Sequence, residues 1–195
     1  NLAWSYDRIG HYWMNRGNPE KAEQLFRERL VLNDRLRQID PNSLTTLHGI
    51  ASVNGLLAAV AEKRGDGATV RARRDAALAA ARQLVAAQPR NRIYLLEAHF
   101  ANRSVAKLCF AGGDFTNAAL LTEEAIRLSE QIVKLDPTDT DARQWHFDAL
   151  RERSNLPLQI GDRVPAEEYL RRARGVTELP ALESNSNWPR DALRG

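Results

Sequence analysis

A glycine corner recurs along this chain at a fixed interval. The pair Gly17-Asn18 is followed by Gly65-Asp66, Gly113-Asp114 and Gly161-Asp162, each 48 residues after the last. Glycine adopts the left-handed backbone conformation that ends many helices, and Asn or Asp can cap the helix that follows. Four such corners in one phase indicate a repeat protein, in which one supersecondary unit is stacked several times.

Prolines keep the same step. Pro41, Pro89 and Pro137 are 48 residues apart, and each lies 24 residues after a corner. Apolar residues recur at helical spacing in the intervals between these markers, so each interval is expected to hold one helix. The expected helices are 4–16, 19–39, 44–64, 68–87, 93–111, 115–135, 139–160 and 165–176.

The expected fold class is therefore all-α. Alanine, leucine, arginine and glutamate dominate the sequence, and all four favour helix. We expect an α-solenoid of four antiparallel helix pairs over residues 1–178, with repeats at about 1–42, 43–90, 91–138 and 139–178. Residues 179–195 are polar and turn-rich, and are expected to form a C-terminal cap or a flexible tail. The start at Asn1, without a methionine, leads us to expect a piece of a longer protein.

The first repeat resembles the tetratricopeptide motif in a series of large, small and aromatic positions: Tyr6, Ile9, Gly10, Trp13, Gly17, Asn18, Ala22, Phe26, Asp40 and Pro41. It departs from the motif at Arg29, where the family has a small alanine. The usual step is about 34 residues, so the 48-residue step here lengthens both helices of a pair by about two turns. The resemblance is to the long-helix variety of tetratricopeptide array found in large bacterial signalling proteins.

This resemblance implies a superhelix in which the first helices of the pairs line a concave groove. Such a groove binds an extended peptide or a partner helix. Gly55 and Ala59 are expected to form a shallow floor that leaves room for a ligand side chain. Stepping through the first helices by 48 residues predicts the lining: Trp4, Asp7, His11, Asn15, His48, Lys63, Phe100, Arg103, Lys107, Arg151, Asn155 and Gln159.

The cationic part of this lining suggests the chemistry of the ligand. We expect Arg103, Lys107 and Arg151, beside Asn155, to receive an acidic group such as a peptide carboxylate, an Asp or Glu side chain, or a phosphate. Guanidinium groups match carboxylates with two parallel, charge-assisted hydrogen bonds. In the alternative interpretation, Arg103 and Arg151 pair with Asp148 or Glu152 on the protein's own surface.

Other functional classes find little support in the sequence. The four histidines share no metal-ligand spacing, and Cys109 is the only cysteine, so neither a zinc site nor a disulfide is expected. There is no phosphate-binding loop or nucleophile motif, and we expect neither catalysis nor a cofactor. A net charge of +3 is too small to indicate nucleic-acid binding by itself. We expect no apolar run to reach the roughly 20 residues of a membrane helix.

The sequence thus predicts a protein–protein interaction module that is not an enzyme and forms the regulatory part of a larger bacterial signalling protein. Its expected partner is another protein or a peptide that carries an acidic group, with no role for nucleic acid or membrane. One alternative is a sensor that binds a small signal peptide and changes its superhelical pitch. Another is self-association into a homo-oligomer through the exposed ends of the repeats. A cytoplasmic location is expected, unless an upstream membrane helix places the domain outside.

Overall fold

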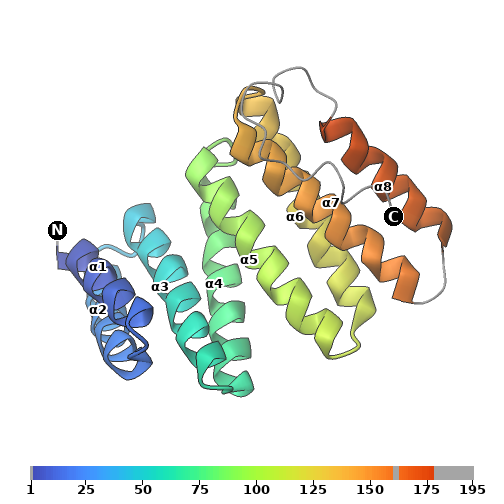
Figure 1. The fold of residues 1–195 in the computed structure, drawn as a ribbon. Coiled ribbons are helices and arrows are strands. Elements are labelled where there is room, and N and C mark those ends of the chain that lie inside the picture. The colour runs from blue at the N-terminus through green and yellow to red at the C-terminus, as the bar shows by residue number, and fades with distance from the viewer. Residues whose placement is uncertain (1, 160–162, 178–195) are drawn as a thin grey trace. The chain divides into compact units, whose positions relative to one another are not determined.

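In the computed structural model, the helices begin and end near the repeated glycine corners and prolines of the sequence. The structure describes residues 2–159 and 163–177, and within them every regular element is an α-helix. The elements, drawn in Figure 1, are α1 (Leu2–Asn15), α2 (Pro19–Ile39), α3 (Leu44–Lys63), α4 (Gly67–Ala87), α5 (Arg92–Ala111), α6 (Phe115–Leu135), α7 (Thr140–Gln159) and α8 (Arg163–Thr177). The prediction of an all-α chain of tetratricopeptide-like helix pairs is confirmed.

Three of the glycine corners have the same backbone geometry. Gly17, Gly65 and Gly113 have φ angles of 72°, 71° and 76°, the left-handed conformation that glycine adopts without strain. In each corner the residue after the glycine donates its N–H to a carbonyl five residues back. These bonds are Asn18 to Trp13 at 2.9 Å, Asp66 to Ala61 at 3.0 Å and Asp114 to Cys109 at 2.8 Å. They match the Schellman motif. The fourth corner, Gly161-Asp162, lies outside the described residues.

The residue after each of these glycines caps the next helix. The side chains of Asn18 and Asp66 accept the backbone N–H groups of Lys21 and Thr69, both at 3.0 Å. The side chain of Asp114 accepts the N–H of Asn117 in the same way, at 3.1 Å. One short segment therefore ends one helix and starts the next, which explains why the corner is repeated as a unit.

A glycine also allows α1 and α2 to pack closely. A Cβ atom at Gly10 would overlap the ring of Phe26, which is fully buried. The residues that follow Gly10 at the 48-residue step are all small and buried: Ala58, Ala106 and Ser154. The glycine position of the motif is therefore a close-packing position, and only the pair with Phe26 opposite needs glycine.

The chain divides into two compact units, residues 1–128 and 129–195, and α6 contributes residues to both. In the first unit successive helices contact one another from α1 to α5 (Figure 1). One core cluster joins Ala22 and Phe26 of α2 to Val53, Leu57 and Val60 of α3. In the second unit α7 packs against α8, and the side chains of Ser129 and His146 are hydrogen-bonded at 3.0 Å. The first unit therefore stacks helix pairs as the solenoid prediction requires.

Helix α3 is the most apolar helix of the first unit. An 18-residue window of this helix has a mean hydropathy of 1.4, so by length and composition alone it could cross a membrane. The expectation that no apolar run reaches this length was therefore wrong. Half of that window is buried, however, and α3 packs against α2 and α4. The central helix of a stack is apolar because neighbours cover it on both sides.

Candidate functional site

The first helices of the first unit carry the positions that the 48-residue step predicts for the groove. Helix α3 contacts α5, and both lie in the stack that begins with α1 (Figure 1). At the 48-residue step, Gly55 on α3 corresponds to Asp7 on α1 and to Arg103 on α5. We call the side of α1, α3 and α5 that carries these positions the first-helix face.

The centre of the first-helix face is open at Gly55. A Cβ atom added to this glycine would meet no described atom within 4 Å beyond its own helix backbone and chain neighbours. Gly55 and Ala59 are both half-buried. By contrast, a Cβ at Gly49, less than two turns earlier on α3, would meet the Asn33 side chain at 3.0 Å. There is therefore free space beside Gly55 on α3, and the groove floor at Gly55 and Ala59 stays a prediction.

Helix α5 places an aromatic ring and two cations on its side of the face. Phe100, Arg103 and Lys107 follow one another at intervals of three and four residues, so they lie on the same side of the helix. The Phe100 side chain is 41% exposed, Lys107 is exposed, and Arg103 is half-buried. An exposed ring with cations beside it offers both apolar contact and charge to a ligand.

On α1, Asp7 is paired with an arginine of the same chain. The Arg29 guanidinium donates from Nη1 to Asp7 Oδ1 at 2.5 Å and lies 3.4 Å from Ser52 Oγ of α3. Arg29 is buried, with 6% of its surface exposed. Burial raises the pKa of Asp7 above its usual value, although the charge of Arg29 acts in the opposite direction. Asp7 thus neutralises the arginine that replaces the small residue of the motif.

His48 joins α3 to α5. Its Nε2 lies 3.5 Å from Glu97 Oε2, and its ring centre lies 5.9 Å from that of Tyr94. His48 is half-buried, so this contact is a link between two neighbouring first helices.

The remaining predicted residues fall into two groups. In the first unit, Trp4, His11, Asn15 and Lys63 are exposed, and the Arg8 guanidinium lies 5.0 Å from the centre of the Trp4 ring. In the second unit, the exposed Arg151 and Asn155 lie on α7, and Arg151 Nη2 is 3.9 Å from Asp148 Oδ1. Gln159 is the last residue of α7, and its side chain lies outside the described residues. Phe100, Arg103 and Lys107 lie on one side of α5, a helix that contacts α3.

A hollow that the sequence did not predict lies along α2, between residues of α1 and the end of α3. It has a volume of about 730 Å³ and contains none of the predicted groove residues. Its lining is Leu2, Tyr6, Glu20, Glu23, Gln24, Arg27, Glu28, Val31, Leu32, Arg35 and Arg64. A signal was present, since Val31 and Leu32 are apolar residues outside the buried stripe of α2.

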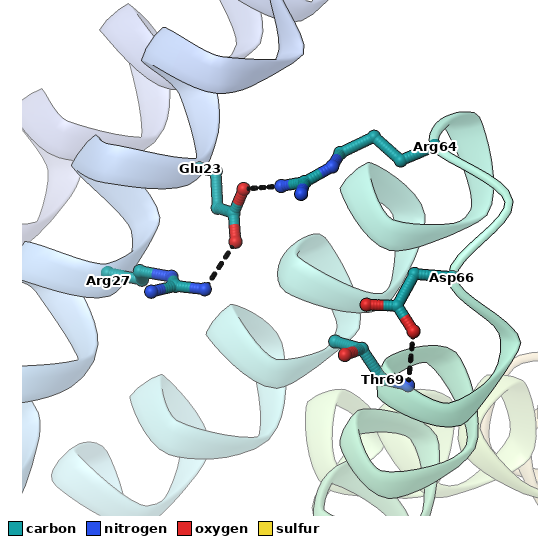
Figure 2. Close-up of polar contacts among 5 residues, drawn as sticks. All are labelled: Glu23, Arg27, Arg64, Asp66 and Thr69. Atoms are coloured by element: carbon teal, nitrogen blue, oxygen red, sulfur yellow. Dashed lines mark hydrogen bonds and ion pairs between the residues drawn. The ribbon is translucent and has the colours of Figure 1, made fainter.

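An ion-pair bridge closes one end of this hollow. Figure 2 shows Glu23 of α2 between two arginines, Arg27 of the same helix and Arg64, which caps the end of α3. The Glu23 side chain is 16% exposed, so this carboxylate is well shielded. Below it, Asp66 accepts the N–H of Thr69 at the start of α4 (Figure 2). The bridge ties α2 to the α3–α4 corner.

The described residues contain no group of three or more His, Cys, Asp or Glu side chains that could hold a metal ion. Cys109 is buried, and its sulfur lies 3.8 Å from Arg71 Nη1. A buried thiol of this kind packs as a small apolar side chain.

Comparisons with known proteins give likenesses of fold. No family model matches the chain, and no curated protein matches it. A solved structure of MamA protein is 14% identical, covers 96% of this chain and 98% of its own, and has a TM-score of 0.37. TTC0263, a thermophilic TPR protein of Thermus thermophilus, is 17% identical over 89% and 90% of the two chains, with a TM-score of 0.33.

A third solved structure, residues 41 to the end of MamA from Desulfovibrio magneticus RS-1, is 13% identical. It covers 90% of this chain and 95% of its own, with a TM-score of 0.32. Each of these TM-scores is below 0.5, so the likenesses say nothing of what this chain binds or does. The tetratricopeptide-like architecture therefore rests on the chain's own helix pairs and on the corners that repeat between them.

Proposed function

We propose that this chain is a protein–protein interaction module whose first-helix face binds a peptide or a partner helix. The binding position is the floor at Gly55 and Ala59 on α3, with Phe100, Arg103 and Lys107 of α5 along one side. The observation that carries this proposal is the open space at Gly55, within a helix that is otherwise closely packed. Helix-interior glycine costs roughly 0.5–1 kcal/mol relative to alanine, so a glycine without a packing reason is consistent with a binding role.

The chemistry of the side formed by α5 favours an acidic group in the ligand. The Arg103 guanidinium can offer two parallel donors to a carboxylate, and Lys107 adds a second positive charge one turn away. Exposed ion pairs contribute only about 0.2–1 kcal/mol each. Most of the affinity must therefore come from apolar contact with Phe100 and the floor, while the cations select the ligand and orient it.

The module would act as the regulatory part of a larger protein, recruiting a partner without performing chemistry itself. This part of the proposal is supported by the resemblance of the repeats to long-helix tetratricopeptide arrays. Arg151 and Asn155 on α7 remain predicted contributors to acid recognition.

A peptide screen tests the proposal. The chain would be applied to an array of random peptides at low and high salt, and the enriched peptides titrated by fluorescence anisotropy. Enriched peptides should contain an acidic group next to an apolar residue. The variant Arg103→Ala/Lys107→Ala should bind them about tenfold more weakly or worse, with the loss shrinking at high salt. An unchanged affinity in this variant would reject the role of α5.

A further inference from the structure

The outer side of α2 carries side chains in an order that complements itself. Along the helix, the exposed residues that line the hollow are Glu20, Gln24, Arg27, Glu28, Val31 and Arg35. Reversing the direction of the helix aligns Glu20 with Arg35, Arg27 with Glu28, and Gln24 with Val31. Opposite charges thus face each other when this stripe meets an antiparallel copy of itself.

The same hollow has an apolar floor. Leu2 and Tyr6 of α1 and Val31 and Leu32 of α2 all line it. Leu2 is 58% exposed and Val31 is 50% exposed, which is high for large apolar side chains. Exposed apolar residues rimmed by charges are typical of surfaces that another protein covers.

We propose that a second copy of this chain covers the hollow, with the two α2 helices antiparallel across a two-fold axis. A two-fold contact uses the same patch on both partners, so the patch must complement itself, as this stripe does. Arg27 and Glu28 of the two copies meet near the axis. The apolar residues Leu2, Tyr6 and Val31 of each copy lie on either side of it. Glu20 of each copy pairs with Arg35 of the other at the rim.

The polar contacts within one chain leave these rim charges available. Among the described residues, no hydrogen bond or ion pair involves the side chains of Glu20 or Arg35. Glu23, at the centre of the bridge in Figure 2, is neutralised within its own chain by Arg27 and Arg64. Arg27 uses one terminal nitrogen for Glu23 and has further donors for Glu28 of the other copy.

Charge reversal with light scattering tests this proposal. The wild-type chain should be dimeric at about 100 μM, a concentration that populates complexes with micromolar dissociation constants. Glu20→Arg and Arg35→Glu should each raise the dimer dissociation constant about tenfold or more, because like charges then meet at both ends of the contact. The double variant Glu20→Arg/Arg35→Glu should restore the dimer.

Mixing provides a test that does not depend on the stability of either variant. At a concentration where the Glu20→Arg and Arg35→Glu chains are each mainly monomeric alone, their mixture should form a heterodimer, since both rim pairs are then complementary. Arg82→Glu, at an exposed position on the equivalent second helix α4, is the matched control and should leave the dimer intact. Three results would each overturn the proposal: a monomeric wild type, a dimer dissociation constant that neither charge reversal changes, or a mixture of the two variants that stays monomeric.

Discussion

Arg29 Nη1 of α2 donates a hydrogen bond to Asp7 Oδ1 of α1 over 2.5 Å, and so ties the first helix pair together at the edge of the first-helix face. The arginine occupies the place of a small residue in the repeat. Its charge is buried, and Asp7 is the counter-charge. Asp7, a predicted groove residue, therefore stabilises the fold instead of facing a ligand. The proposed recognition site accordingly lies on α3 and α5.

Replacing Arg29 tests this pairing. Arg29→Leu should lower the free energy of unfolding at pH 7 by about 1–3 kcal/mol, because Asp7 stays partly desolvated without its charged donor. The loss should shrink on acidification, since protonated Asp7 needs no counter-charge. Urea unfolding at pH 7 and pH 4 measures both effects. Arg27→Leu, at an exposed position, should cost little at either pH, and equal costs for the two variants would contradict the pairing.

The pH dependence of Asp7 itself has a definite sign. Burial raises the pKa of Asp7 in the folded chain, so the folded state holds this proton to a higher pH than the unfolded state. Protonation of Asp7 therefore favours the folded state. Its contribution to the free energy of unfolding is fully present below the unfolded pKa, about 3.9, and is lost as pH rises through the folded pKa. Carboxyl NMR should therefore find Asp7 titrating above that reference value.

Two helix-interior glycines should respond in opposite ways to alanine. Gly10→Ala should destabilise the fold by about 1–3 kcal/mol, because the new methyl group overlaps the buried ring of Phe26. Gly55→Ala should instead stabilise it by about 0.5–1 kcal/mol, because the space is open and alanine favours helix. Thermal or urea unfolding of both variants gives the comparison. The same sign for both would mean that the packing at one of them is misassigned.

The cost of replacing a glycine near a corner should depend on its φ angle. Gly65 has a φ of 71°, so Gly65→Ala should cost about 1–2 kcal/mol for placing a Cβ in the left-handed conformation. Gly67, two residues later, begins α4 and does not have a positive φ, so Gly67→Ala should be neutral or stabilising. Equal effects of the two substitutions on urea unfolding would argue against the corner geometry.

The capping acids should make the fold sensitive to acid. Hydrogen bonds from Thr69, first from its side chain and then from its backbone N–H, hold the pKa of Asp66 below its usual value. Asn117 does the same for Asp114. The stabilisation from such a group is present above the unfolded pKa and is lost as pH falls through the lower folded pKa. Asp66→Ala/Asp114→Ala should flatten the acid limb of the stability curve, and an unchanged limb would contradict the capping role.

The repeated glycine corners and prolines predicted most of the helix boundaries. The corner glycines and the closing prolines are local signals, because a positive φ and a missing N–H act on a helix within a few residues. The observed ends of α2, α4 and α6 therefore agree with the expected ranges to within about one residue. The close approach of Gly10 to Phe26 was not predicted, because it depends on how α1 packs against α2.

The candidate site was only partly predictable. The 48-residue step singled out Gly55, where the structure leaves free space. The alignment of Arg103 with Lys107 follows from their spacing of four residues on one helix. The pairing of Asp7 with Arg29 does not, because it depends on how a long side chain from α2 reaches α1 through the core. The hollow beside α2 was also missed, since its charged lining looks like an ordinary solvated helix surface.

The most direct test of the central claim fills the floor of the first-helix face. Gly55→Leu places an apolar side chain at a position where an added Cβ atom meets nothing within 4 Å. We expect its melting temperature to match or exceed that of the wild type. Its affinity for the peptides enriched in the array, measured by fluorescence anisotropy, should fall about tenfold or more. A stable Gly55→Leu chain that binds those peptides with wild-type affinity would contradict the proposal that this face is the binding site.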